Sequence, residues 1–266
     1  MNGTTTMNAL IDDIVTGLDE IAGLDALWPR GAVHRGGPHY RLRGTVGPVS
    51  IGMDECRVFG KLIQETRPAR CFIIGNAFGL SSVFIAKMME QCGGQHVVTL
   101  DNQSEGDGQR NAAIAQSLTE RLECRLLSNR KGESPRDIPR VAGERPYDMI
   151  LIDGLHRHPQ VTRDFLGVRE IATDDAVFCW HDYWMLGIPQ SVAEAQRCGF
   201  HCVKVNSSCE IVLGTRNESV YHRIEALYDN TEPPRKRLRP TAFLKACHAM
   251  ATGTLSTWRA RTRQAR

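Results

Sequence analysis

Continuous apolar runs alternate along the chain with amphipathic segments. The clearest example is the stretch from Cys71 to Ala86. It begins as an unbroken apolar run, as expected for a strand that is buried on both faces. Gly75 and Gly79 interrupt the run, and apolar residues then recur at helical spacing. We therefore predict a strand, a glycine turn and a helix in succession.

Further segments of both kinds follow as far as residue 232. We predict helices at residues 53–66, 107–121 and 216–232, a short helical segment after Ser134, and helices that begin near Pro159 and Ile188. We predict strands at residues 95–100, 123–128, 147–152, 176–183, 201–205 and 209–214. Strands that alternate with helices in this way indicate an α/β fold.

The N-terminal part of the chain has a different pattern. Residues 8–28 predict an amphipathic helix, which either covers the core of its own domain, as we favour, or forms the seam of a homodimer. The apolar residues on its one face are Ile11, Ile14, Leu18, Ile21 and Trp28. The loop from Pro29 to Gly47, rich in Gly, His and Arg, is either a lid or a surface connection. We divide the chain into an N-terminal helix and loop (1–46), a central domain (47–215) and a C-terminal helix and tail (216–266).

The composition is that of one sizeable α/β domain with additional segments. The nine cysteines of the 266-residue chain form no CxxC pair, and several lie inside apolar strands. They predict reduced thiols of a cytoplasmic protein. The chain begins without the basic and apolar pattern of a signal peptide, and no run approaches the roughly 18 apolar residues of a membrane span.

The net charge of +3 conceals an uneven distribution. After Glu232 there are nine Lys or Arg residues and no acidic residue. Without those nine, 24 of the 33 basic residues remain against 30 acidic ones, so residues 1–232 carry a net charge of −6. We therefore expect no nucleic-acid partner for the central domain, because only the tail is basic.

A glycine turn at the carboxyl end of a parallel strand can bind a nucleotide-like ligand. Glycine tolerates both a tight turn and a close approach to a ligand. The candidate binding residues are Gly75, Asn76, Ala77, Phe78 and Gly79, together with Ser81 near the free N–H groups of the new helix. That helix N-terminus would suit a ligand carboxylate. A dinucleotide fingerprint would need glycines at positions 75, 77 and 80, where this chain has Ala77 and Leu80.

An acidic residue follows the next predicted strand. Asp101, with Asn102 after it, stands where a carboxylate can accept hydrogen bonds from both hydroxyls of a ribose. The alternative is a solvated aspartate in a turn. We favour binding, because the glycine turn predicts an acid at this place.

The turn resembles the first motif of class I S-adenosyl-L-methionine (SAM) methyltransferases, acidic-x-Gly-x-Gly/Ala-x-Gly, with Ile73 in the acidic place. Residues 147–165 contain Asp153-Gly-Leu-His156 and resemble the Asp-Gly-Asp-His segment of a bacterial family related to catechol O-methyltransferase and to antibiotic-pathway sugar O-methyltransferases. Residues 176–183 resemble the next strand of that family, which ends in His-Asp. The resemblance covers about residues 47–215. It implies a Rossmann-like sheet of seven mostly parallel strands, with the last strand antiparallel and helices on both sides.

The resemblance also implies roles for particular residues. Methyltransferases of this kind commonly place adenine contacts after the third strand, here at Glu133 and Ser134. Related enzymes bind Mg²⁺ through carboxylates at the ends of the fourth and fifth strands, here Asp153 and Asp182. His156 would be the general base, although it could instead only cap the following helix.

Two departures leave the metal open. Leu155 stands where many relatives carry a second acid, and His181 stands where catechol-type enzymes carry an acid before the last ligand. The resemblance therefore implies SAM as the cofactor and leaves dependence on Mg²⁺ undecided.

The function that follows is SAM-dependent O-methylation of a hydroxyl on a small molecule or sugar. One alternative is an NAD-dependent oxidoreductase, which would share the sheet and Asp101. A second is a protein that binds the cofactor without turnover, which Ile73 and Leu155 would suggest. Calorimetry with S-adenosylhomocysteine (SAH) and NAD separates the first two functions, and a turnover assay separates the third.

The basic tail yields a prediction of its own. Residues 233–266 carry basic residues interleaved with Phe243, Leu244, Leu255 and Trp258. Such a segment either stays solvated or packed on the domain, or lies on an anionic membrane, where each Lys or Arg contributes about 1 kcal/mol. If it binds membranes, the full-length protein floats with anionic liposomes and a chain ending at Glu232 does not. Equal recovery of the two forms would contradict a membrane role.

Overall fold

The computed structural model describes residues 3–22, 26–28, 39–41, 51–104, 108–228 and 231–232. Its helices are α1 (Gly3–Ala22), α2 (Met53–Thr66), α3 (Leu80–Gln91), α4 (Gly108–Arg121), α5 (Ile138–Ala142), α6 (Gln160–Arg169), α7 (Ile188–Arg197) and α8 (Glu218–Leu227). Its strands are β1 (Ala26–Trp28), β2 (His39–Arg41), β3 (Arg70–Ile74), β4 (His96–Asp101), β5 (Leu127–Lys131), β6 (Tyr147–Ile152), β7 (Ala172–Trp180), β8 (His201–Val205), β9 (Ile211–Thr215) and β10 (Thr231–Glu232).

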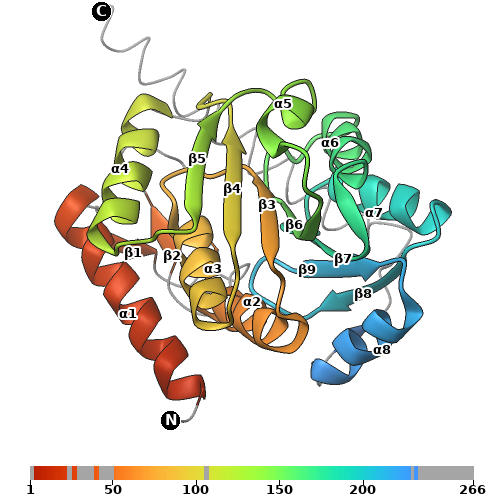
Figure 1. Ribbon diagram of the computed structural model, residues 1–266, viewed down its shortest axis with the longest axis horizontal. Coiled ribbons are helices and arrows are strands. Elements are labelled where there is room, and N and C mark those ends of the chain that lie inside the picture. The colour runs from red at the N-terminus through yellow and green to blue at the C-terminus, as the bar shows by residue number, and fades with distance from the viewer. Residues whose placement is uncertain are drawn as a thin grey trace, which may run out of the picture.

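The main sheet crosses the molecule with helices on either side (Figure 1). Its strand order is β10-β8-β9-β7-β6-β3-β4-β5. The strands β3 to β7 pair in parallel, and β9 runs antiparallel to both β7 and β8. The predicted α/β class and the seven principal strands with an antiparallel last strand are thus confirmed. The short strand β10 adds an antiparallel edge beside β8.

Alternate residues of the central strands enter two different cores. In β3, Cys71 and Ile73 pack with α1, α2, α3, α4 and α8, whereas Phe72 and Ile74 pack with α5, α6 and α7. This alternation is the two-residue period of a strand, and it explains why the sequence shows an unbroken apolar run. Packing on both faces of the sheet therefore holds the ends of the central strands in place.

The N-terminal helix α1 covers the core of its own domain. Leu10, Ile11, Ile14 and Leu18 are buried, and the helix packs on α3 and α4. The predicted extension of this helix to Trp28 is wrong, because Ala26–Trp28 is the strand β1, paired antiparallel with β2. Backbone pairing in this two-stranded sheet prevails over the helical spacing of the apolar residues.

Three other predicted elements are shifted. The strand expected at 176–183 is β7 at Ala172–Trp180, and the chain leaves the strand before Asp182, which takes a left-handed conformation (φ 56°). The strand expected at 123–128 is β5 at Leu127–Lys131, because Glu123 takes a left-handed conformation (φ 48°) in the turn that ends α4. The helix expected at 216–232 is α8 at Glu218–Leu227. The Asn217 side chain caps its start by accepting from the Val220 N–H, and the extended conformation of Tyr228 ends it. The chain then joins the sheet as β10. The predicted hairpin of β8 and β9 is confirmed.

Several predictions fall outside the described residues. The loop over 29–47 is described only at His39–Arg41, and the tail over 233–266 is not described. The division of the chain at residues 46 and 215 also stays a prediction. In the described part of the chain, no helix has the length and apolarity needed to cross a membrane.

The glycine turn brings the ends of two strands together. Gly75 has φ +88°, a backbone conformation that favours glycine. A Cβ at this position would lie 2.2 Å from the carbonyl oxygen of Asp153, which follows β6. Gly79 packs closely against α4 in the same way, since a Cβ added at this position would lie 2.9 Å from the Cβ of Ala115. Close backbone packing therefore requires both glycines.

We predict that Gly75→Ala lowers the free energy of unfolding by at least about 2 kcal/mol. A left-handed conformation costs an L-residue roughly 1–2 kcal/mol, and overpacking adds roughly 1–3 kcal/mol. Gly93→Ala is the matched control, because Gly93 has φ +83° but no atom lies within 4 Å of its Cβ position. Denaturant titration compares them, and an equal loss in both variants would contradict the role of close packing.

Candidate functional site

Asp101 organises the glycine turn from the end of the neighbouring strand β4. Its Oδ2 accepts the backbone N–H groups of Asn76 at 2.7 Å and Ala77 at 3.2 Å. Its Oδ1 accepts the N–H of Gln103 at 2.5 Å. The sequence placed Asp101 beside the turn correctly, and the structure shows that its carboxylate also holds the turn in shape.

A network of side chains continues from Asn76. Its Oδ1 accepts the hydroxyl of Ser82 at 2.6 Å, and its Nδ2 donates to Oδ1 of Asn129 at 3.1 Å. Asn129 lies on β5 and also accepts the hydroxyl of Thr99. Sequence reasoning missed Asn129, which directly follows the strand predicted at 123–128 and lies inside β5.

A small pocket lies beside the turn. Its walls come from the turn, the end of β4, the start of α4, and β5. The side chains or backbone that line it include Asn76, Ala77, Thr99, Asp101, Asn111 and Asn129. This lining is rich in carboxylate, amide and hydroxyl groups, which can bind the hydroxyls and nitrogens of a nucleoside.

The remaining predicted binding residues have different surroundings. The side chain of Phe78 is only 1% exposed and packs in the core, and Ser81 is also buried, in the first turn of α3. Asn102 follows Asp101, and its Oδ1 accepts the N–H of Ser104 at 3.0 Å. Gly79 offers no side-chain cap to α3, and the first turn of that helix carries no acidic residue.

The turn after β5 is tied to helix α6. The hydroxyl of Ser134 donates to Oδ1 of Asp164 at 2.6 Å, and Gln160 donates to the same oxygen at 2.8 Å. Burial raises the pKa of Asp164, although these hydrogen bonds act in the opposite direction. Glu133 is exposed and pairs with Arg136 at 3.1 Å. Sequence reasoning missed Gln160 and Asp164, which position this turn.

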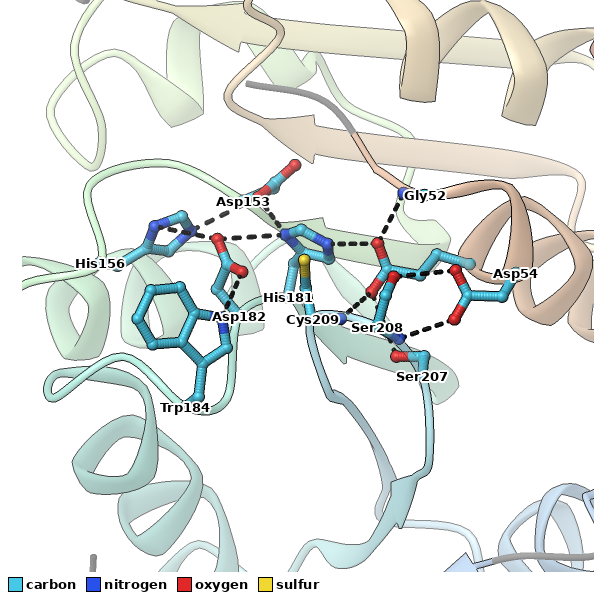
Figure 2. Close-up of polar contacts among 11 residues, drawn as sticks. Gly52, Asp54, Asp153, His156, His181, Asp182, Trp184, Ser207, Ser208 and Cys209 are labelled. Carbon is cyan, nitrogen blue, oxygen red and sulfur yellow. Dashed lines mark hydrogen bonds and ion pairs between the residues drawn. The ribbon is translucent and has the colours of Figure 1, made fainter. Parts of the chain in front are cut away.

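A second group of polar side chains lies at the carboxyl ends of β6 and β7 (Figure 2). His181 Nδ1 lies 2.9 Å from Asp153 Oδ1 and 3.5 Å from Asp182 Oδ2. His156 lies 3.4 Å from Asp153 Oδ1 through Nε2 and 3.6 Å from Asp182 Oδ2 through Nδ1. Trp184 Nε1 donates to Asp182 Oδ1 at 2.8 Å. The predicted convergence of Asp153, His156 and Asp182 is thus present.

The charges of this group shift one another's pKa values. Burial alone would raise the pKa of Asp153, but His181 and His156 outweigh it and hold that pKa below its usual value. The pKa of Asp182 is lowered in the same way, against the effect of burial, by the same two imidazoles.

The two imidazoles shift in the opposite sense. Burial alone would lower the pKa of each histidine, but the carboxylates around His181 raise its pKa well above 6.5, and Asp153 and Asp182 raise that of His156. Protonated imidazoles and ionised carboxylates therefore stabilise one another here.

The two parts of the site adjoin one another. Gly75 belongs to the turn that Asp101 organises, and its Cα faces the backbone of Asp153, which belongs to the second group. A ligand held at the turn would therefore lie near the backbone of Asp153, at the carboxyl edge of the sheet, where parallel sheets bind their ligands.

The second group also has the dimensions of a metal site. Asp153, His156, His181 and Asp182 each offer one ligand atom, and these atoms lie within 4.8 Å of one another. Two oxygens and two nitrogens suit a transition ion such as Mn²⁺ or Zn²⁺ better than Mg²⁺, which prefers oxygen ligands. A metal would have to replace the protons that the raised pKa values favour on the imidazoles.

Sequence reasoning missed Glu55, which is fully buried in the first turn of α2. Its Oε2 lies 3.0 Å from His181 Nε2, so it adds a third carboxylate around that ring. The sequence signal was the acidic pair Asp54-Glu55 at the start of a helix, which is an ordinary helix-start pattern.

Comparison with known proteins relates this fold to that of methyltransferases. Residues 72–183 match the model of a family described as a methyltransferase domain. No curated protein matches the chain. The match spans the glycine turn, Asp101 and the second group from Asp153 to Asp182, but not α2.

Solved structures of methyltransferases share the fold. One is the O-methyltransferase TomG from Streptomyces achromogenes, which is involved in tomaymycin synthesis and was solved with SAM. It is 16% identical to this chain, with a TM-score of 0.53, and the alignment covers 63% of this chain and 82% of the TomG chain. A methyltransferase from Podospora anserina bound to SAH is 8% identical over 78% of this chain and 88% of its own, with a TM-score of 0.60. An O-methyltransferase from Bacillus cereus in complex with SAH is 18% identical over 75% and 90%, with a TM-score of 0.52.

Residues 72–183 therefore match a methyltransferase domain, and the chain has the fold of the solved methyltransferases. The resemblance inferred from the motifs is confirmed. The comparisons give no support for an NAD-dependent oxidoreductase.

Proposed function

We propose that the protein is a SAM-dependent O-methyltransferase that acts on a hydroxyl of a small molecule or sugar. One observation carries this proposal: the turn organised by Asp101 adjoins, through Gly75, a buried group of two carboxylates and two imidazoles. One part suits a nucleoside cofactor and the other suits deprotonation of a hydroxyl. The solved structures of TomG and of the Bacillus cereus enzyme are O-methyltransferases with SAM or SAH.

The residues of the turn fit this cofactor. The polar pocket beside Asn76 and Asp101 offers partners for the ribose and adenine. The first turn of α3 carries neither a side-chain cap nor an acidic residue, so its N–H groups suit the methionine carboxylate. When bound, SAM supplies an electrophilic methyl group on its sulfonium sulfur.

The chain's own residues prepare the acceptor. His156 is the general base, and it takes the proton of the acceptor hydroxyl on a ring nitrogen. Asp153 and Asp182, at 3.4 and 3.6 Å from that ring, stabilise the imidazolium that results. Because their charges raise the pKa of His156, turnover rises with pH as this imidazole loses its proton. Positioning the hydroxyl against the methyl group contributes further, and in well-oriented systems this effect reaches ~7–11 kcal/mol.

We predict that Asp101→Ala weakens SAH binding by about 1–3 kcal/mol in calorimetry, because charge-assisted hydrogen bonds to the ligand and the turn are lost. The matched control is Asp148→Ala. Asp148 likewise accepts two backbone N–H groups, those of Ala69 and Arg70, but it does so at the opposite end of β3.

The control should bind SAH as tightly as the wild type, and neither the wild type nor the variants should bind NAD. An Asp101→Ala variant with wild-type affinity would contradict the assigned cofactor site. Turnover of acceptor pools with labelled SAM then separates an enzyme from a protein that only binds the cofactor.

We also propose Asp153 and Asp182 as metal ligands, with Mg²⁺ as the ion that the sequence resemblance implies. A divalent ion there would stabilise the alkoxide or phenolate of the acceptor. The prediction is that EDTA abolishes turnover and that an added divalent ion restores it. Because the His181 imidazole lies beside these two carboxylates, Mn²⁺ should restore turnover at lower concentration than Mg²⁺. Full turnover in EDTA would leave His156 acting without a metal.

The proposal also includes the location of the protein and its assembly. A cytoplasmic location is supported by the eight described cysteines, all of which are free thiols. A homodimer seam on α1 has less support, because the apolar face of α1 is already buried in its own domain. Membrane contact through residues 233–266 rests on the sequence alone.

A further inference from the structure

Glu55 is a charged side chain that the proposed reaction does not yet use. Its carboxylate is completely buried and accepts hydrogen bonds at both oxygens. Oε2 accepts the Gly52 N–H at 2.8 Å, while Oε1 accepts the Ser207 hydroxyl and the Cys209 N–H, both at 3.1 Å. With donors on both oxygens, the carboxylate acts as an acceptor.

The fourth contact of Glu55 reaches the site. Its Oε2 lies 3.0 Å from His181 Nε2, and because the carboxylate is an acceptor, Nε2 must donate. The opposite nitrogen of the ring, Nδ1, then faces Asp153 Oδ1 at 2.9 Å and Asp182 Oδ2 at 3.5 Å. Figure 2 shows the His181 ring lying between these two sides.

We propose that Glu55 is a positioning residue for the acceptor half of the site, and this inference rests on the proposed function. An imidazole ring is rigid, so fixing Nε2 on Glu55 also fixes Nδ1 toward Asp153 and Asp182. Glu55 thereby sets where the two carboxylates stand relative to the acceptor and to His156. It does so from α2, outside the matched residues 72–183.

A simpler role for Glu55 is to tie the turn between β8 and β9 to α2. The neighbouring Asp54 performs that role without touching the site. Its Oδ2 accepts the Ser208 N–H at 2.6 Å and its Oδ1 accepts the Ser208 hydroxyl at 2.8 Å. Both acids lie in the first turn of α2 and accept hydrogen bonds from the turn between β8 and β9, but of the two only Glu55 contacts His181. Asp54 is therefore a matched control.

The test compares Glu55→Gln with Asp54→Asn. The neutral amide keeps the size of Glu55 but removes the charge that orients His181. We expect Glu55→Gln to lower kcat by about 10- to 100-fold, the range typical of groups that orient another ligand or base, with KM and the Kd for SAH within about twofold of wild type. Asp54→Asn should keep kcat within about twofold. Melting temperatures are measured for both, and Glu55→Asp replaces Glu55→Gln if the latter does not fold.

A second readout does not depend on turnover. In proton NMR the His181 Nε2–H, buried against Glu55, should give a slowly exchanging imidazole signal in the wild type and in Asp54→Asn. The signal should exchange faster in Glu55→Gln, whose neutral amide oxygen accepts more weakly than a carboxylate. It should be absent from a His181→Gln variant, which assigns it. Absence of the signal from the wild type would overturn the inference.

The outcomes separate this inference from the proposed function. A wild type that binds no SAH contradicts the proposed function, whatever the variants do. A wild type that binds SAH and methylates an acceptor, with equal kcat in Glu55→Gln and Asp54→Asn, leaves the function intact and overturns the role of Glu55. A loss of kcat that only follows the loss of melting temperature in both variants would also overturn it.

Discussion

The site depends on one buried imidazole, that of His181, which lies among carboxylates from three different elements. Glu55 comes from α2, Asp153 follows β6 and Asp182 follows β7. Carboxylates taken out of water are costly unless an opposite charge and hydrogen bonds compensate them. His181 provides that charge at 2.9–3.5 Å to all three, and His156 provides a second one from the solvent side. The same balance of charges shifts the pKa values of the two histidines and two aspartates, and acid–base chemistry at this site would depend on those values.

Backbone packing determines how the two proposed halves of the site meet. We call the glycine turn with Asp101 the cofactor half, and the group of Asp153, His156, His181 and Asp182 the acceptor half. Gly75 is commonly understood as the residue that admits a ligand, but here its missing Cβ first admits the backbone of Asp153. The ends of β3 and β6 can therefore lie side by side, with the turn packed against the backbone of Asp153. Asp101 then fixes the turn through its N–H groups. The geometry that would bring a methyl donor to an acceptor is thus set before either is bound.

The sequence predicted the parts of this arrangement that depend on strand order. Parallel strands end at one edge of a sheet, so recognising that Asp101, Asp153 and Asp182 each follow a strand was enough to bring them together. The sequence could not predict Glu55, which is separated from His181 by 126 positions. In a sequence, an acidic residue in the first turn of a helix is already explained by its favourable interaction with the helix dipole. Only the tertiary structure shows that this carboxylate faces a buried ring.

The errors in element boundaries have a related physical cause. The strand β5 lies at the edge of the sheet, and three of its residues, Leu127, Ser128 and Asn129, are only partly buried. An edge strand of this kind carries no apolar run, so the pattern favoured the more apolar residues just before it. The same polar character made Asn129 available to bind Asn76 beside the pocket. The weak sequence signal of β5 and the hydrogen bond of Asn129 to Asn76 therefore have the same cause, the exposure of this edge strand.

The two halves of the site differ in what holds them. The cofactor half is held by contacts within β3, β4 and β5, as the bonds of Asp101 and Asn129 show. The acceptor half is held across the molecule, because Glu55 joins α2, the end of β7 and the turn at Ser207–Cys209. Substitutions in that turn would reach His181 through Glu55 without passing through Asp101. This separation gives a physical reason why the acceptor half could change while the cofactor turn keeps its geometry.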